Sequence, residues 1–562
     1  MASEKVPVAV NEPSAESPAP APAPAPPTTA DEPNSSDPPP EKPSDQRRRM
    51  FIILSFWVLI VLLGLPIWWK TTSIYRSDLP LTEMMEWADG KACKPVFPLQ
   101  VTVQADSLQE QEAQTLLRQT QHALDDLNDF TAHHLRLQLA PRDAAGSSEP
   151  KVDSQSAVTI RLVPGDSTMS SSLDPTQPVL DITYPPNSVP SHSSSSTPST
   201  LAAYIATELR ATFAEEQAIL SYLLSSSSPS PSSSEARTKS LSPELLASLE
   251  KRTTRALKYS HTYHLTFSLF TAGASPSTWD IDAALAEYIR PVLDVLSPIH
   301  NFTVDTQVQL YATPGVQSEV LSKDDLVSFI NAAEWPLSPS IGGAPTINFI
   351  IYIGNQTVRL SDPSESPEAT TTSQSWLVPQ WGSVYLLSLA PTTTHVDVPA
   401  LKQPLLTFSS HLLSLLGTPE TGSLPLRLST LSRIRSADLL LRASSTLGSL
   451  ARLSLALPSI SIPRSVADGV SKTLTRLDRA CENLAAPAAL EYARVAESEA
   501  ERAFFEKSMV GQLYFPDEHK VAVYLPLLGP VGVPLVMGLV NEIRGWVRRR
   551  RERAEAARRK EE

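Results

Sequence analysis

Cysteine is scarce in this chain: the 562 residues include only Cys93 and Cys481. Two cysteines supply neither a disulfide framework nor, by themselves, a zinc site. Two interpretations of the pair stay open. In an oxidising compartment the two thiols would form one disulfide that joins distant parts of the chain, and otherwise both stay free.

The familiar catalytic motifs are also missing. The sequence contains no HExxH, GxSxG, P-loop, GxGxxG or CxxC motif. A cysteine–histidine nucleophile would need Cys93 or Cys481 beside a histidine, and neither cysteine has such a local context. His395 precedes Asp397 by two residues, but this pair lies in a Thr- and Pro-rich stretch typical of a solvated loop. We therefore expect no catalytic, cofactor-binding or metal-binding residue in the chain.

The strongest hint of chemistry is a D-x-D pair, Asp280 and Asp282. In sugar-nucleotide transferases this spacing can hold a divalent metal, which makes a metal-dependent glycosyltransferase the main enzymatic alternative. The pair also lies at the start of a predicted helix at 282–296, and carboxylates favour the positive end of a helix dipole. We prefer the interpretation that these two acids only begin the helix.

Acidic residues outnumber basic ones, 60 to 47, and the net charge is −13. The acidic excess lies in the central region 70–520, whereas the carboxy-terminal tail 541–562 is basic. An acidic domain argues against nucleic acid as a partner. The basic tail favours anionic membrane lipid instead.

Two long apolar segments are present, one near each end. The first covers 50–69 and follows Arg47, Arg48 and Arg49; the second covers 521–540 and precedes an arginine cluster. About twenty apolar residues suffice to cross a hydrocarbon core of ~30 Å. Because Lys and Arg gather on cytoplasmic flanks, we expect transmembrane helix 1 at 50–69 and transmembrane helix 2 at 521–540. Both termini would then be cytosolic and the main domain lumenal.

Between these segments the pattern is that of an α/β protein. Residues 1–49 form a Pro- and Ala-rich tail, which we expect to be disordered and cytosolic. The region 70–520 alternates strand-like and helix-like stretches, and the run at 347–353 is apolar enough for a strand covered on both faces. We predict one large lumenal α/β domain with mixed or mostly parallel sheets flanked by helices, with Ser-rich loops near 191–199 and 225–234.

Two N-x-S/T sequons lie in the predicted lumenal region, at Asn301 and Asn355. Each follows a predicted element and is expected near a surface turn. Both are candidate N-glycosylation sites.

Five blocks of sequence, taken together with their order, resemble a known protein family. They are WWKTTSIYRSDLP (68–80), KYSHTYHLTFSLF (258–270), WDIDAALAEYIRPVLDVL (279–296), NFTVDTQVQLYA (301–312) and WLVPQWGSVYLL (376–387). In this order, and between two terminal apolar segments, they resemble the PIG-S subunit of the GPI transamidase. The resemblance covers most of 50–540. It leaves out the amino-terminal tail and the serine-rich inserts.

This resemblance implies an endoplasmic-reticulum membrane protein in a complex with PIG-K, PIG-T, PIG-U and a further multi-spanning subunit. The complex cleaves the carboxy-terminal signal of a precursor protein and joins the new end to a GPI lipid, with the catalytic thiol in PIG-K. The chain is thus expected to be a non-catalytic structural or assembly subunit, without a cofactor. The alternatives are the glycosyltransferase that uses Asp280 and Asp282, and a stand-alone membrane scaffold.

Overall fold

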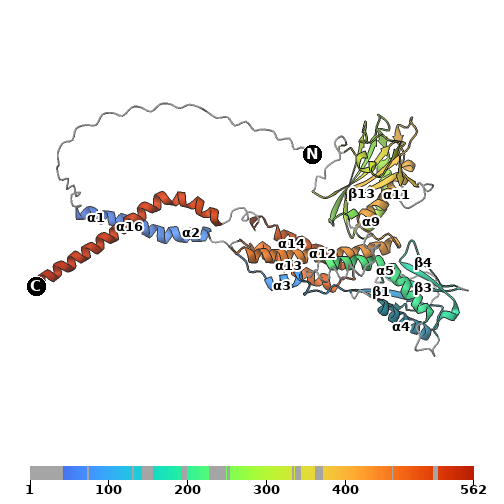
Figure 1. Ribbon diagram of the computed structural model, residues 1–562, viewed down its shortest axis with the longest axis horizontal. Coiled ribbons are helices and arrows are strands. Elements are labelled where there is room, and N and C mark those ends of the chain that lie inside the picture. Colours follow the sequence, from blue (N-terminus) through green and yellow to red (C-terminus); the bar gives the residue numbers. More distant parts are fainter. Residues whose placement is uncertain are drawn as a thin grey trace, which may run out of the picture. The chain divides into compact units, whose positions relative to one another are not determined.

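The computed structural model divides into two compact units (Figure 1). One contains the chain ends Met1–Ser73 and Val521–Glu562, and the other is Ile74–Lys520. The described residues are 42–72, 75–128, 132–141, 156–165, 168–190, 199–226, 249, 254–331, 335, 343–360, 371–458, 460–509 and 517–561. Most of the predicted tail at 1–49 and most of both predicted serine-rich loops lie outside the described residues.

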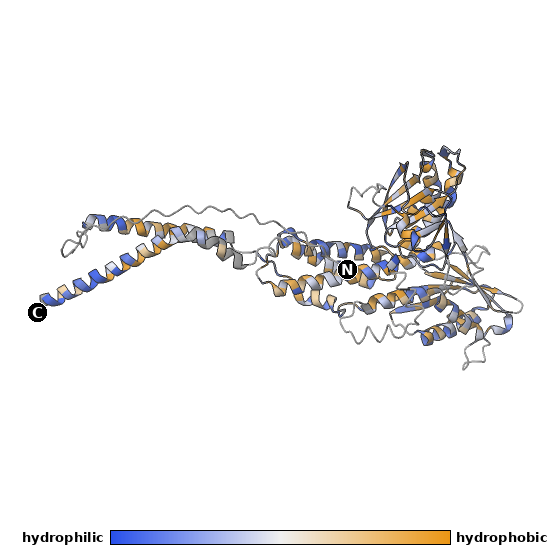
Figure 2. Ribbon diagram, turned by 45° about the horizontal axis from the view of Figure 1, so that its top comes forward, coloured by the Kyte–Doolittle hydropathy of each residue, from blue (hydrophilic) through white to orange (hydrophobic). Residues whose placement is uncertain are grey.

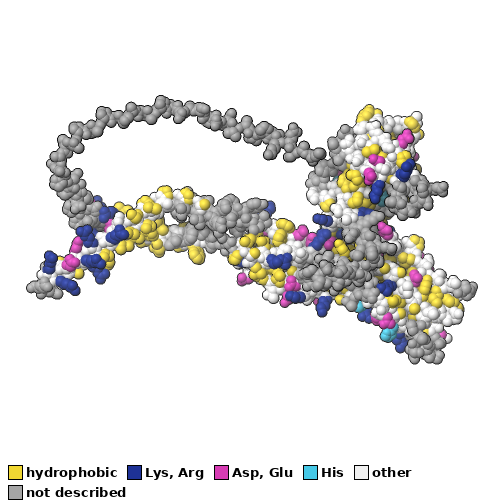
Figure 3. All heavy atoms as spheres, viewed as in Figure 1, with side chains coloured by type: hydrophobic (Ala, Val, Ile, Leu, Met, Phe, Trp, Pro, Cys, Tyr) yellow, Lys and Arg dark blue, Asp and Glu magenta, His cyan; other side chains and the backbone are white. Residues whose placement is uncertain are grey.

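The first unit is helical. It consists of α1 (Pro43–Leu59), the π-helix η1 (Ile60–Gly64), α2 (Leu65–Thr72) and α16 (Asp517–Glu561). Arg49 Nε on α1 donates to Glu542 Oε1 on α16 at 2.8 Å, so the two helices contact each other. Lys and Arg side chains gather toward the carboxy-terminal end of α16 (Figure 3).

The prediction of two membrane spans is wrong. Within the described residues, no helix combines the length and the apolar character that crossing a bilayer requires. The apolar stretch at 50–69 is divided among three elements, and α1, with 17 residues, begins with the polar run PSDQRRR. The stretch at 521–540 is only one part of the 45-residue α16 and contains three prolines. The transmembrane anchoring, the two-span topology and the membrane localisation derived from them are therefore not supported.

The second unit begins with a five-stranded sheet in the order β2-β1-β3-β5-β4. Its strands are β1 (Phe97–Gln104), β2 (His133–Leu139), β3 (Val158–Pro164), β4 (Ser170–Leu173) and β5 (Val179–Tyr184). All neighbours are parallel except β4, which lies antiparallel at one edge. Alternate residues such as Leu99, Val101 and Val103 pack against α4 (Glu110–Leu127) and α5 (Thr200–Ser226). A short 3₁₀ helix, Pro186–Ser188, precedes α5.

A second five-stranded sheet has the order β13-β14-β10-β6-β8. Its strands are β6 (Thr262–Thr271), β8 (Asn301–Gln309), β10 (Thr346–Ile353), β13 (Ser375–Val378) and β14 (Gly382–Leu387). Only β13 runs antiparallel, and the central strands are strongly apolar (Figure 2). One face, with Phe267 and Phe349, packs on Phe408 of α11 (Val398–Leu415). The other face is covered by an aromatic cluster that includes Phe329, Trp335 and Trp376.

Short elements surround this second sheet. A continuous helical segment consists of α8 (Ile281–Ala284), the π-helix η3 (Leu285–Ile289) and α9 (Arg290–Leu296). A two-stranded pair is formed by β7 (Thr278–Trp279) and β15 (His395–Val396). A three-stranded sheet contains β9 (Val320–Leu321), β11 (Thr357–Leu360) and β12 (Thr371–Ser373), and α10 (Asp325–Phe329) lies in the same part of the chain.

Helices join the two sheets. The 33-residue α12 (Leu424–Ala456) contacts α5 and also α3 (Leu81–Ala88), α13 (Arg464–Glu482) and α14 (Ala488–Phe504). Small residues let α13 and α14 approach closely: a Cβ added to Gly469 would lie 3.2 Å from the Ala503 Cβ. Cys93 and Cys481 are joined in a disulfide, with their Cα atoms 6.2 Å apart. The result is an α/β unit with mixed sheets and flanking helices.

Candidate functional site

The carboxyl ends of parallel strands are the usual place for a site in an α/β fold. Beyond this edge of the second sheet, β7 and β15 lie side by side and bring together residues that are distant in the sequence. His395 Nε2 lies 3.1 Å from Asp280 Oδ2, and His395 Nδ1 lies 2.9 Å from Thr278 Oγ1. The carboxylate accepts from Nε2, so in the neutral imidazole Nδ1 accepts from the threonine hydroxyl. The order is hydroxyl, imidazole, carboxylate.

This relay is exposed to water. The side chains of His395 and Asp280 are 44% and 49% accessible, and neither residue lines the groove described below. In solvent, such hydrogen bonds compete with water and the charged forms are screened. A nucleophile needs a desolvated pocket and donors for the developing oxyanion, and the relay has no such enclosure. The geometry is that of a surface contact that holds β15 against β7.

The two carboxylates of the D-x-D pair serve different purposes. Asp280 pairs with His395, whereas Asp282 lies exposed in the first turn of α8. Asp397, which the sequence places near His395, instead accepts from the Ala400 amide at 3.2 Å and caps α11. In the described part of the chain, no group of three or more His, Cys, Asp and Glu residues could hold a metal ion. The pair thus does not form the shared ligand set that a glycosyltransferase would need.

The sequence did not predict a serine–histidine contact that lies between the second sheet and α11. Ser383 Oγ on β14 lies 2.5 Å from His411 Nδ1 on α11, and it also donates to the Trp376 carbonyl at 3.1 Å. The serine proton is therefore directed to a carbonyl, so Nδ1–H must be the donor to Ser383. In that tautomer the histidine cannot take the serine proton. Burial lowers the His411 pKa to about 4, with a smaller effect from Arg255, and Ser383 itself is fully buried. The contact is structural.

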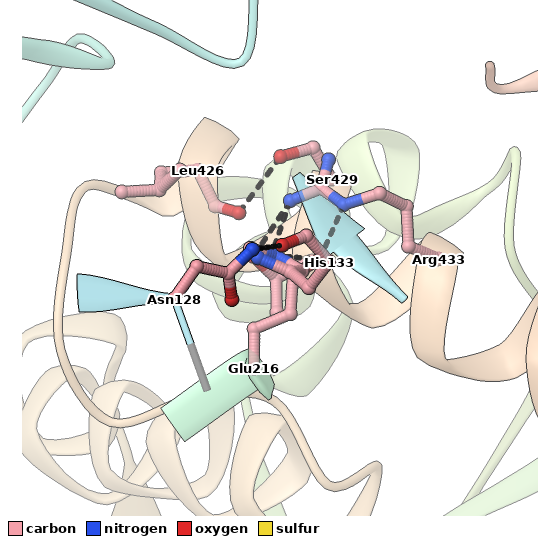
Figure 4. Close-up of polar contacts among 7 residues, drawn as sticks. Asn128, His133, Glu216, Leu426, Ser429 and Arg433 are labelled. Atoms are coloured by element: carbon pink, nitrogen blue, oxygen red, sulfur yellow. Dashed lines mark hydrogen bonds and ion pairs between the residues drawn. The ribbon is translucent and has the colours of Figure 1, made fainter. Parts of the chain in front are cut away.

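The most strongly buried charges lie where α5 meets α12. Arg433 donates from Nε to Glu216 Oε1 at 2.6 Å and from Nη2 to Oε2 at 2.7 Å (Figure 4). Thr430 Oγ1 also donates to Oε2, at 2.8 Å. His133 Nε2 lies 3.7 Å from Oε1, too far for a hydrogen bond. Burial opposes ionisation of Glu216, but the charge and hydrogen bonds of Arg433 outweigh it and hold the pKa of this carboxyl well below its usual range.

The Glu216–Arg433 pair is buried and fully hydrogen-bonded, whereas the neighbouring His133 Nε2 has no hydrogen-bond partner among the described residues. The Glu216 and Arg433 side chains are 2% and 6% accessible, and Arg433 reaches the carboxylate with two parallel hydrogen bonds. Such a bidentate pair fixes the relative positions of the two side chains. It leaves the Glu216 carboxylate occupied, so this group is not offered to a substrate. It joins the helix that covers the first sheet to the long α12. We find here a structural link rather than a catalytic acid.

A large groove lies beside β8. It has a volume of about 900 Å³ and runs between the α8–η3–α9 segment and the strand. Apolar side chains line it on both walls: Leu285, Ala286, Ile289 and Leu293 on the helical side, and Phe302 and Val304 on the strand. Asp282, Arg290, Asp294 and Asp305 also line it. An open, partly apolar groove along a strand is suited to a polypeptide rather than to chemistry.

Comparison with known proteins decides the family. A model described as "Phosphatidylinositol-glycan biosynthesis class S protein" (PIG-S) matches residues 55–549. The chain belongs to the PIG-S family. Similar PIG-S proteins include "GPI-anchor transamidase component PIGS" of Homo sapiens, 29% identical over 536 residues, which are 87% of this chain and 94% of the human protein.

Two fungal proteins are similar too. "GPI transamidase component PIG-S homolog" of Schizosaccharomyces pombe is 28% identical over 525 residues, which are 89% of this chain and 85% of that protein. "GPI transamidase component GPI17" of Saccharomyces cerevisiae is 30% identical over 323 residues, 51% of this chain and 58% of its own. The resemblance inferred from the sequence blocks is therefore confirmed.

The remaining predicted residues of this PIG-S family member lie on the second unit. Asn301 is the first residue of β8, and its amide Nδ2 lies 3.1 Å from His261 Nε2. Asn355 is exposed between β10 and β11, and its Oδ1 accepts from Ser388 Oγ at 2.6 Å. Glycosylation of both asparagines stays a prediction. The Glu216 network has no sequence motif, because its residues come from distant segments of the chain. The residues that line the groove, in contrast, all lie within 282–306.

Proposed function

We propose that this chain is a non-catalytic subunit of the GPI-anchor transamidase and that it helps to attach GPI anchors to precursor proteins. The observation that carries the proposal is the match to the PIG-S family over residues 55–549. Human and fungal relatives that match most of this chain are named as components of that transamidase.

Three features of the described residues favour a role without chemistry. The two cysteines are joined to each other, so neither is available as a thiolate nucleophile. Ser383 is buried with its proton directed to a carbonyl. The relay through His395 is exposed and has no enclosing pocket. In the family scheme the nucleophile belongs to PIG-K, and these features are consistent with that division of labour.

The partners proposed for this subunit are PIG-K, PIG-T, PIG-U and a further multi-spanning subunit. An accessory subunit contributes to catalysis by holding the reacting groups of its partners in position. The second unit suits this role, because α12 packs on α5, the buried Glu216–Arg433 pair links these two helices, and a disulfide joins the segment before β1 to α13.

Removal of the gene tests the proposal. A GPI-anchored reporter is expected to disappear from the cell surface, and its precursor should accumulate with the carboxy-terminal signal still attached. Wild-type chain should restore anchoring, and so should His395→Ala, which removes the imidazole of the exposed relay. Normal anchoring without the gene would contradict the proposed function. Rescue by wild type but not by folded His395→Ala would contradict the non-catalytic role.

A further inference from the structure

The outer edge of the second sheet is an unpaired strand. Within the described residues, β8 pairs with β6 on one side and with no strand on the other. Asn301 N–H donates to the His261 carbonyl at 2.8 Å, toward β6. Because backbone groups alternate in direction along a strand, those of Phe302, Val304, Thr306 and Val308 point to the free side. At this edge, the backbone N–H and C=O groups of four residues are therefore directed toward an additional strand.

Neither proline nor a bulge protects that edge, and the candidate glycosylation site Asn301 lies at its first residue. Soluble proteins usually shield an edge strand by keeping it short, or with proline, bulges or outward charges. The strand has nine residues, NFTVDTQVQ, without proline, and its register with β6 is uninterrupted. Its single charge, Asp305, lies 2.9 Å from His264 Nε2 on the neighbouring strand. At the opposite edge, by contrast, β13 has four residues.

A groove lies beside this edge. The helical segment α8–η3–α9 leaves about 900 Å³ beside β8, lined by half-buried Leu285 and Leu293 and by Val304, which is 39% exposed. A strand added to β8 would direct every second side chain to this side of the sheet. Those side chains would have apolar walls to pack against. Backbone pairing and side-chain pockets thus occur together, as in other cases of strand addition.

The charges of the groove restrict what can bind. Three carboxylates line it, from Asp282, Asp294 and Asp305, against one guanidinium, from Arg290. His300, which also lines the groove, does not add positive charge. Burial, with a smaller effect from Arg435, lowers its pKa to about 3, so it is neutral at physiological pH. The groove is net acidic and complements a basic segment.

We propose that β8 is a docking strand: an extended, basic segment of another transamidase subunit adds to it as the next strand of the sheet and places alternate apolar side chains in the groove. This inference rests on the proposed function. It names the surface by which the subunit holds a partner.

The backbone part of the proposal is tested with Thr306→Pro. Because the Thr306 amide points to the free side, proline there removes a donor for the added strand without breaking the ladder to β6. Tagged full-length chain is purified with its associated subunits, and their recovery is measured by quantitative mass spectrometry. We expect recovery of the docked subunit to fall about tenfold, since its carbonyl is left unpaired. Thr306→Ala, which keeps the amide, should bind as wild type does. Equal recovery with both variants overturns the proposal.

The charge part uses variants that leave the strand intact. Asp294→Lys and Asp282→Lys reverse charges in the groove, and each is expected to weaken recovery of the same subunit several-fold. Glu287→Lys is the matched control, because Glu287 is exposed on the same helical segment but does not line the groove. If Glu287→Lys weakens recovery as much as the groove variants do, the effect is one of overall charge and the proposal is wrong.

A photo-crosslinker at Val304 identifies the occupant. The expected product joins β8 to a segment of a co-purified subunit that carries Lys or Arg and alternating apolar residues. In the assembled complex, the peptide that contains β8 should also exchange its amide hydrogens more slowly than in the chain purified alone. A crosslink to this chain itself, or none while the complex stays intact, overturns the docking role but leaves the proposed function standing. Absence of any transamidase subunit from the purification contradicts the function itself.

Discussion

Replacing Arg433 with methionine would test the buried link between α5 and α12. The substitution removes both guanidinium hydrogen bonds to Glu216 and leaves the carboxylate buried with only the Thr430 hydroxyl as a strong donor. Methionine fills much of the same volume, so the main effect is an uncompensated charge. Breaking a buried pair in this way costs about 3–5 kcal/mol of folding free energy. We expect Arg433→Met to lower the stability of the full-length chain by this amount near neutral pH.

The pH dependence of this loss of folding stability is a more specific test. In the wild type the Glu216 pKa is lowered, so its stabilising contribution is complete above the unfolded pKa of about 4.3 and is lost as pH falls toward the folded value. In Arg433→Met, burial acts without the guanidinium and should raise the pKa of Glu216. As the pH falls, Glu216 of the variant then becomes protonated, which removes the uncompensated buried charge and reduces the variant's loss of folding stability. The stability gap between wild type and variant should therefore be larger at about pH 7.5 than at about pH 5.

Urea unfolding, followed by tryptophan fluorescence at both pH values, measures this gap. Arg442→Met is the matched control on the same helix, because Arg442 Nε contacts Asp438 Oδ1 at 3.2 Å with its side chain 36% accessible. That control should cost no more than about 0.5 kcal/mol. Adding Glu216→Met to Arg433→Met should recover part of the loss. Equal losses for both arginines, or a gap that widens at lower pH, would refute the reasoning.

Two further changes test the second unit. Cys481→Ala removes a crosslink between residues 388 apart and should cost about 2–5 kcal/mol; a reductant should then lower the melting temperature of the wild type but not of the variant. Gly382→Ala would place a Cβ 1.9 Å from the Asn348 carbonyl oxygen across the β10–β14 pair, so we expect a loss of about 1–3 kcal/mol. Gly273→Ala, where a Cβ has no neighbour within 4 Å, is its control in the same thermal melts and should change little.

Local patterns predicted several elements well. The apolar run 347–353 corresponds to β10, which lies between β6 and β14 and is covered on both faces. The helix predicted at 282–296 exists, although a π-helical turn interrupts it. No element was predicted over 200–224 and a Ser-rich loop was predicted near 225–234, yet residues 200–226 form the 27-residue α5. This helix supplies both apolar cover for the first sheet and Glu216. Periodicity reports one face of an element and not which partner will cover it.

The errors have physical causes as well. Counting apolar residues at 50–69 and 521–540 predicted two spans, but the count ignores where a helix begins and how its geometry changes along the way. Spacing in the sequence paired His395 with Asp397 and Asp280 with Asp282. The fold instead pairs His395 with Asp280, because β15 lies beside β7. A contact between residues more than a hundred positions apart depends on the sheet topology, which a motif does not contain.

The disulfide also has a consequence for how the molecule is made. Cys93 is synthesised 388 residues before Cys481, and the chain contains no other cysteine. At about 5–20 residues per second, the first thiol waits roughly 20–80 seconds before its partner exists. During that interval no wrong pairing within the chain is available to it, and only thiols of other molecules can capture it. Closure of this bond therefore marks a chain whose second unit has been made almost to its end.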